Sequence, residues 1–247
     1  MPVSGQRSKV IVMAIRWPLL VRRTHKWLAL LVGVQALLWT LTGLYMVVVH
    51  IDTIHGDHLV RAPVVEPFDL SGGLAPPSRI VAAASGASEI RLQRLFDRTV
   101  WRAETPDGPQ LFDARSGVLL PALTAPQIRE QARRIYTGDG KIVSVRLLTS
   151  APQEMQSRKP PYWQVEFAGW NRPTLYLSPT TGELVSRRHA LWRVFDFAWM
   201  LHIMDYDERT DVNNTLLRVA TWSTFAMSLM GAWLLFWSFK RRKRKTA

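Results

Sequence analysis

The run WLALLVGVQALLWTLTGLYMVVV, residues Trp27–Val49, holds 23 consecutive residues without a charged side chain. A second uncharged run of 21 residues, Val219–Phe239, lies near the other end of the chain. An α-helix rises about 1.5 Å per residue, so about 20 residues are enough to cross a hydrocarbon core of about 30 Å. These two runs predict transmembrane helices over residues 27–49 and 214–239.

The chain has 247 residues and a net charge of +13, and two terminal blocks supply twelve of these charges. Residues 1–26 and 240–247 each carry six Lys and Arg and no acid, whereas the residues between them hold 20 bases and all 19 acids. Basic residues beside a span stay on the cytoplasmic side, so we expect both tails in the cytoplasm. The charge therefore predicts an orientation in the membrane. It does not predict a nucleic-acid partner, because a nucleic-acid-binding protein would carry its Lys and Arg on the folded domain.

Other residue types limit the chemistry. Cysteine is absent, which excludes disulfides, thiol nucleophiles and Cys-ligated zinc or iron–sulfur sites. The sequence also lacks a nucleophile elbow, a phosphate loop, an HExxH motif and a dinucleotide fingerprint. The residues leave open whether the chain is an enzyme, and these absences favour a protein that is not one.

The segment between the two runs predicts an α+β domain built from two similar units. A linker rich in Pro and Gly over residues 50–77 precedes them. In each unit a helical stretch is followed by three alternating stretches, which are typical of antiparallel strands with one buried face. The helix and strands cover residues 78–84, 90–95, 100–104 and 110–119 in the first unit and 126–134, 142–148, 162–167 and 174–184 in the second. We assign the units to residues 78–121 and 122–188.

Each unit closes with a similar hairpin, FDARSG at residues 112–117 and LSPTTG at residues 177–182. These hairpins resemble those of PepSY domains, although the second has Ser178 where the family usually has Asp. The segments RRTHKWL (22–28), LTGLYM (41–46), HGDHL (55–59) and WMLHIMDY (199–206) resemble the PepSY-associated transmembrane proteins of bacterial inner membranes. The resemblance implies two transmembrane helices that flank a periplasmic domain of two PepSY-like units, each a helix plus a three-stranded antiparallel sheet.

The resemblance implies two functions. The first is an inner-membrane-anchored binding or regulatory module, linked to iron uptake or envelope function, whose partners are the lipid bilayer and a membrane or periplasmic protein. The second is a haem b-binding electron-transfer subunit for periplasmic ferric-siderophore reduction, because larger relatives with four spans look like haem-holding ferric-siderophore reductases. A purely structural anchor is a third alternative, and a homodimer is compatible with each.

Three histidines are candidate haem ligands: His25, His50 and His202. His25 and His50 are 25 residues apart, or about 37 Å along a helix, so they cannot share an iron. His50 and His202 both belong at the outer membrane face and could share one. The alternative is ligation in a dimer or with a partner subunit. Asp205 follows His202 by three residues, so its carboxylate could orient the imidazole.

His55, Asp57 and His58 are candidate ligands for a transition metal. The alternative for them is a polar turn that leads the chain off the membrane. Residues 189–213 predict an interfacial helix followed by an acidic loop. Asp211 and Asn213 are expected to cap the last helix.

Small residues recur on one stripe of each apolar run, which favours packing of the two spans on each other over a dimer seam or a cofactor slot. Gln35, the one amide deep in the first run, is expected to form a hydrogen bond across that contact.

Overall fold

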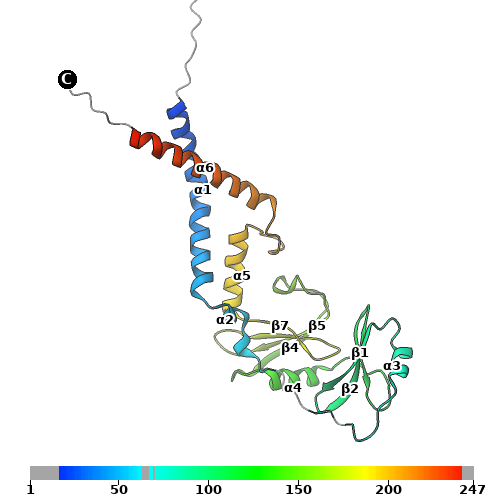
Figure 1. Cartoon of the computed structure of the whole chain (residues 1–247). Coiled ribbons are helices and arrows are strands. Elements are labelled where there is room, and N and C mark those ends of the chain that lie inside the picture. The colour runs from blue at the N-terminus through cyan, green and yellow to red at the C-terminus, as the bar shows by residue number, and fades with distance from the viewer. Residues whose placement is uncertain (1–16, 63–66, 69, 241–247) are drawn as a thin grey trace, which may run out of the picture. The chain divides into compact units, whose positions relative to one another are not determined.

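The structure, a computed structural model, describes residues 17–62, 67–68 and 70–240. Most of the two basic tails therefore lies outside the described residues. The chain divides into two compact units, residues 1–44 with 199–247, and residues 45–198. The helices and strands of both are labelled in Figure 1.

The first unit contains most of one long apolar helix, α1 (Trp17–Val48), all of a second, α6 (Thr215–Lys240), and the last residues of α5 (Ala190–Ile203). Within α1 and α6, Val21–Val48 and Thr215–Phe239 are long and apolar enough to cross a membrane, by length and composition alone. Their large side chains lie on the surface, with Leu31 75% and Phe239 86% exposed. Such helices are compatible with a membrane protein, because lipid can cover apolar side chains that the protein leaves exposed.

Helix α1 begins ten residues before the predicted span, at Trp17. The basic residues that mark the end of the uncharged run, among them Arg22 and Lys26, lie inside the helix. Arg and Lys are good helix formers, so a change of polarity ends the apolar run without ending the helix. The last helix, predicted at residues 214–239, is found at Thr215–Lys240.

The second unit begins with two short helical turns, α2 (Ile51–His55) and η1 (Asp57–Leu59), followed by α3 (Pro77–Ala83). A three-stranded antiparallel sheet comes next, with strand order β1-β2-β3. Its strands are β1 (Glu89–Leu95), β2 (Arg98–Thr105) and β3 (Gly108–Asp113). The first predicted helix and sheet are therefore present. After β3 a single bridge joins Phe112 to Leu119, and Pro121, which has no amide N–H, follows shortly after it.

The second helix and sheet begin with α4 (Ala125–Ile135). The strands are β4 (Ile142–Leu148), β5 (Tyr162–Phe167), β6 (Thr174–Leu177) and β7 (Leu184–Arg188), with the turn η2 (Gln153–Met155) between β4 and β5. This sheet has four antiparallel strands in the order β4-β5-β6-β7, so the prediction of three was wrong. No proline follows the second hairpin before Arg188, so its outgoing arm can pair fully with β6. Helix α5 (Ala190–Ile203) follows directly, as predicted.

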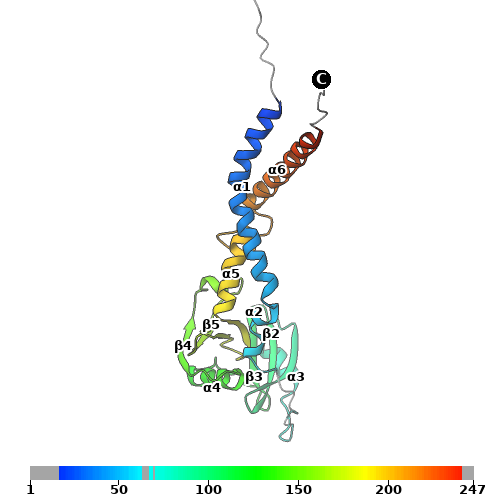
Figure 2. The same ribbon diagram turned by 90° about the vertical axis from the view of Figure 1, so that its left-hand side faces the viewer.

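One hydrophobic core joins the two sheets. Ile128 and Ala132 of α4 are fully buried in a cluster that contains Val165 and Leu175 of the second sheet and also Val100 of the first. On β2 successive side chains point to opposite faces. Trp101 and Ala103 therefore belong to a different cluster, which includes Ile80 of α3. Both faces of the first sheet are thus covered, and the two helix-and-sheet units share their interior. Figure 2 shows the same elements from the side.

Candidate functional site

A groove of about 870 Å³ opens between the two sheets and the segment that follows η1. Four arginines from four separate segments line it: Arg61, Arg94, Arg134 and Arg187. The lining also includes the carboxylates of Asp57 and Glu183, the amide of Gln131, and the apolar side chains of Val60, Ala62, Phe96, Ile135 and Leu184. We call this the arginine groove. It combines an apolar surface with guanidinium groups, and guanidinium groups bind carboxylates and phosphates in bidentate geometry.

Two arginines of this groove, Arg134 and Arg187, pair with exposed carboxylates. Arg134 forms hydrogen bonds with both carboxylate oxygens of Asp97, at 3.1 and 3.3 Å, and the side chain of Asp97 is 82% exposed. The hydrogen bond and the charge of Arg134 lower the pKa of Asp97 below its usual range. Arg187 pairs with Asp57. Exposed ion pairs contribute little stability, so a carboxylate from a ligand can replace these partners at small cost.

Phe96 occupies an unusual backbone conformation at the edge of this groove. It lies in the β1–β2 turn with φ of 54°, in the left-handed region that a bulky side chain rarely adopts. The guanidinium carbon of Arg134 lies 5.7 Å from the centre of its ring, within cation–π range. A residue held in this region costs about 1–3 kcal/mol, and such residues cluster at binding sites.

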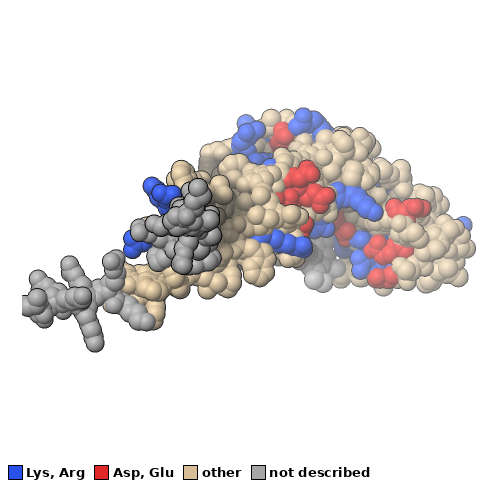
Figure 3. All heavy atoms as spheres, turned by 90° about the horizontal axis from the view of Figure 1, so that it is seen from above, with Lys and Arg blue, Asp and Glu red and all other residues tan. Residues whose placement is uncertain are grey.

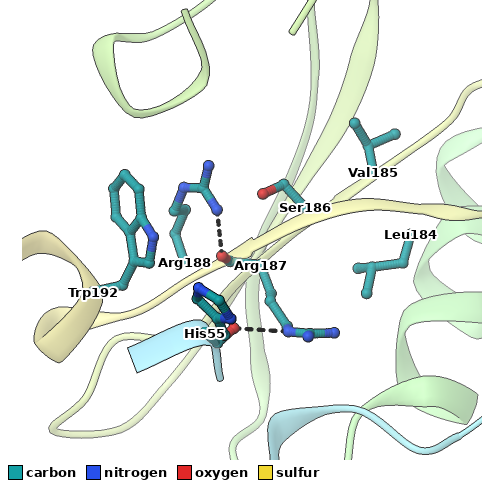
Figure 4. A pocket seen from close by; sticks show the side chains of 7 residues that line it. All are labelled: His55, Leu184, Val185, Ser186, Arg187, Arg188 and Trp192. Atoms are coloured by element: carbon teal, nitrogen blue, oxygen red, sulfur yellow. Dashed lines mark hydrogen bonds between the residues drawn. The ribbon is translucent and has the colours of Figure 1, made fainter. Parts of the chain in front are cut away.

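A smaller hollow of about 250 Å³ continues along β7 and shares Leu184 and Arg187 with the arginine groove. Figure 4 shows the side chains of Arg187 and Arg188 leaving β7 in opposite directions. Arg187 donates to the carbonyl oxygen of His55 at 2.7 Å, and the guanidinium of Arg188 lies 3.8 Å from the ring centre of Trp192. Because β7 is the last strand of its sheet, both hollows lie beside a strand edge that no other strand of the described residues covers.

The candidate metal ligands have other partners. Asp57 pairs with Arg187, and the ring of His58 packs edge-on against His189, with 6.0 Å between ring centres. Over the part of the chain that the structure describes, no three His, Asp or Glu side chains gather in a way that could hold a metal ion. Metal binding at His55, Asp57 and His58 remains a prediction, and the geometry is that of a polar turn.

His189 is a fully buried histidine to which the sequence analysis gave no role. Its Nε2 lies 3.0 Å from the carbonyl oxygen of Ile54, which places the proton of the neutral ring on Nε2. Burial lowers the pKa of His189 and so favours this neutral form. Gly56 lies against the ring: a Cβ there would be 3.0 Å from Cδ2 of His189. His189 therefore joins α2 to the end of β7. No sequence pattern distinguishes it from the exposed histidines.

The candidate haem ligands lie in three separate surroundings. His50 caps α2, where its Nδ1 accepts the N–H of Asp52 at 3.3 Å. The Nδ1 of His202 lies 2.9 Å from the hydroxyl of Thr42 on α1. His25 lies on α1 against Gly231 of α6. Positions 25 and 42 of α1 are 17 residues apart, or about 25 Å along the helix. His25 and His202 of one copy therefore do not fit one haem, and haem binding remains a prediction.

The loop after α5 differs from its predicted arrangement. The carboxylate of Asp205 accepts backbone N–H groups from Asp207, Glu208, Thr210 and Asp211, at 2.9 to 3.3 Å. It organises the loop, and the expectation that it orients His202 was wrong. The cap of α6 is Asn214, whose Oδ1 accepts the N–H of Leu217 at 2.8 Å, in place of Asp211 or Asn213.

Comparisons of the sequence and the structure with known proteins find no matching family model, no matching curated protein and no matching solved structure. The chemistry of the groove is therefore the basis for a functional conclusion.

Proposed function

We propose that this chain is a bacterial inner-membrane protein with cytoplasmic termini, whose segment 45–198 is a periplasmic PepSY-like module that binds and regulates a partner protein. Two apolar helices near the ends of the chain and basic blocks beside them support this placement. Two successive helix-and-sheet units support the PepSY-like architecture.

The observation that carries this proposal is the arginine groove beside the edge of β7, with which no further strand of the described residues pairs. An extended peptide can add to an open strand edge through backbone hydrogen bonds, and pockets beside the edge then select its side chains. Here those pockets present Arg61, Arg134 and Arg187. The ligand that fits is an extended acidic segment of a membrane or periplasmic protein, with apolar residues between its carboxylates. On the face drawn in Figure 3, acidic and basic side chains are interspersed and form no patch of one sign. Recognition therefore depends on the local groove and not on overall charge.

The test measures peptide binding to the full-length chain in detergent. A fluorescent peptide of alternating Glu and Val residues is compared with the same peptide in which Gln or Lys replaces Glu, by fluorescence anisotropy. We expect the Glu peptide to bind at least about tenfold more tightly than the Gln peptide, because one charge-assisted pair contributes about 1.5–3 kcal/mol. Equal binding of the Lys peptide would contradict the proposal.

Matched arginine variants locate the binding site. Arg61→Gln and Arg134→Gln should each weaken binding of the Glu peptide by about five- to tenfold. Arg146→Gln is the control, because Arg146 lies on β4 at the opposite edge of the same sheet and pairs with Glu166 at 2.8 Å. If Arg146→Gln weakens binding as much as the groove variants do, the peptide is attracted by the positive charge of the protein in general and does not bind specifically in the groove.

A separate experiment tests the orientation. A phosphatase that is active only outside the cytoplasm is fused within residues 63–73 or after Ala247. Activity of the first fusion and silence of the second are expected. The reverse result would place the 45–198 body in the cytoplasm.

A further inference from the structure

A second cleft lies in the other unit, where α6 passes α1. Among the described residues, Arg22 and His25 of α1 and Gly231, Leu234, Leu235 and Ser238 of α6 line a volume of about 450 Å³. Gly231 marks the close approach of the two helices, since a Cβ at this position would lie 3.3 Å from Cε1 of His25. Small residues allow such approach between helices in lipid.

The burial of Nδ1 decides which nitrogen of the His25 ring carries the proton. Nδ1 is buried and has no hydrogen-bond partner among the described residues. A neutral imidazole carries one N–H, and a buried N–H without an acceptor is costly. The proton therefore belongs on Nε2, on the part of the ring nearer Gly231, where a Cβ would lie 4.0 Å from Nε2. His25 thus offers an N–H donor to the cleft.

The remaining lining combines a cationic and a polar side chain with two apolar ones. Arg22 supplies a permanent positive charge and Ser238 a hydroxyl, whereas Leu234 and Leu235 are apolar. None of the described residues that line the cleft carries a carboxylate. Residues 240–245, which follow Ser238 closely in sequence, are all Lys or Arg. Donors and positive charge fit a phosphate group, and the adjacent leucines fit an acyl chain.

We propose that this cleft binds the headgroup phosphate of an anionic phospholipid, with Arg22 and His25 as the donors to the phosphate and Leu234 and Leu235 against the acyl chain. Basic pockets between membrane helices recognise lipid headgroups by this combination. The site is separate from the arginine groove: it rests on the proposed placement in a membrane but not on the proposed binding of a partner protein. It would fix the crossing of α1 and α6 in the bilayer.

The test measures lipid retention by the full-length chain with native mass spectrometry. The protein in detergent is mixed with phosphatidylglycerol, with phosphatidylcholine, or with phosphatidylglycerol and excess inorganic phosphate. We expect one phosphatidylglycerol to be retained, phosphatidylcholine to be retained about tenfold less, and inorganic phosphate to compete poorly, because it lacks the acyl chain. Equal retention of the two lipids, or full competition by inorganic phosphate, would overturn the proposal.

Two neighbouring arginines provide the matched comparison. Arg22→Gln should reduce retention of phosphatidylglycerol by about tenfold. Arg23→Gln removes the same charge from the adjacent residue, which does not line the cleft, and should leave retention nearly unchanged. Gly231→Leu fills the cleft while keeping every charge, and should also abolish retention. If Arg22→Gln and Arg23→Gln reduce lipid retention equally, the lipid is attracted to the basic surface as a whole, and the proposed site is wrong.

Discussion

The indole N–H of Trp39 on α1 donates to the carbonyl oxygen of His202 on α5, at 2.7 Å. Two further side chains donate hydrogen bonds to backbone carbonyls at the same end of α5. Gln35 donates to the carbonyl of Leu201 at 3.1 Å, and Asn214 donates to that of Ile203 at 2.9 Å. The last carbonyls of a helix have no partner within it. Side chains from α1 and from the start of α6 therefore hold the end of α5.

The Trp39 hydrogen bond gives a first prediction. Trp39→Phe keeps an aromatic ring but leaves the carbonyl of His202 without its donor. An unsatisfied buried acceptor costs about 1–3 kcal/mol. We expect a lower midpoint of thermal unfolding in detergent and faster proteolysis after α5. Trp222→Phe is the control, because Trp222 is 69% exposed on α6. If both variants unfold at the same temperature, the hydrogen bond contributes no stability.

Arg102 gives a second prediction, on the contact between the two sheets. This buried arginine of β2 forms ion pairs with Glu104 at 2.6 Å and with Glu183, in the β6–β7 turn, at 2.5 Å. Arg102→Ala should lower the free energy of unfolding by about 1–3 kcal/mol, because both carboxylates lose a charged donor. Arg146→Ala removes an exposed pair with Glu166 within the second sheet and should cost less than about 1 kcal/mol. Similar losses in thermal unfolding would mean that Arg102 does not join the sheets.

The parts of the fold that the sequence could predict are those with a local signal. Absence of charge over residues 27–49 and 219–239 marked both long helices, and alternation marked β1, β4 and β5. Strand β7 gave no such signal, because Ser186, Arg187 and Arg188 are consecutive polar residues. Its existence depends on pairing with β6. Gln35 was correctly expected to form a hydrogen bond, but its partner belongs to α5, since packing between helices is decided by tertiary structure.

The candidate site was not predictable for the same reason. Arg61, Arg94, Arg134 and Arg187 lie up to 126 positions apart in the chain and meet only when both sheets have formed. Each is a common surface residue when seen alone. Histidine is a rare residue type, which made His50 and His202 candidate ligands, but in the structure they form hydrogen bonds with Asp52 and Thr42. The rarity of histidine pointed to candidate ligands in the sequence, whereas the arginine groove could be found only in the folded structure.

Asp205 gives a third prediction, on pH. Backbone N–H groups, that of Asp211 first, lower the pKa of Asp205 below its usual range. A depressed pKa means that the carboxylate stabilises the loop at pH values above the usual carboxyl pKa of about 4. This contribution is lost as the pH falls through the lower pKa of the folded protein. Amide exchange in residues 207–211 should therefore stay slow, relative to an unstructured peptide at the same pH, from pH 7 to about pH 4 and lose protection below it.

Substitution at the same residue checks this assignment. Asp205→Asn should weaken protection of residues 207–211 at every pH, because the amide is a poorer acceptor than the carboxylate and cannot titrate. Asp207→Asn removes a neighbouring exposed carboxylate and should keep the acid-dependent loss of protection. If Asp205→Asn still loses protection below about pH 4, another carboxyl group controls the loop.

Gly56 gives the last prediction, because both its backbone conformation and the space around it require glycine. Its φ is +72°, and a Cβ would lie 3.0 Å from the ring of His189. Gly73 has the same φ of +72° and nothing within 4 Å of an added Cβ. Gly73→Ala should therefore cost only the backbone term of about 1–2 kcal/mol. Gly56→Ala should cost more, since the buried ring has to move.

Thermal unfolding of both variants, each with and without His189→Ala, separates the two contributions. His189→Ala alone should destabilise the 45–198 body, because it removes the hydrogen bond to Ile54 and leaves a cavity. In that background the cost of Gly56→Ala should fall toward that of Gly73→Ala, because the contact with the ring is gone and only the backbone term and a 3.1 Å contact with Cδ1 of Leu59 remain. A double-mutant cycle measures this coupling directly. If Gly56→Ala costs the same with and without the imidazole, the contact between α2 and His189 does not constrain residue 56.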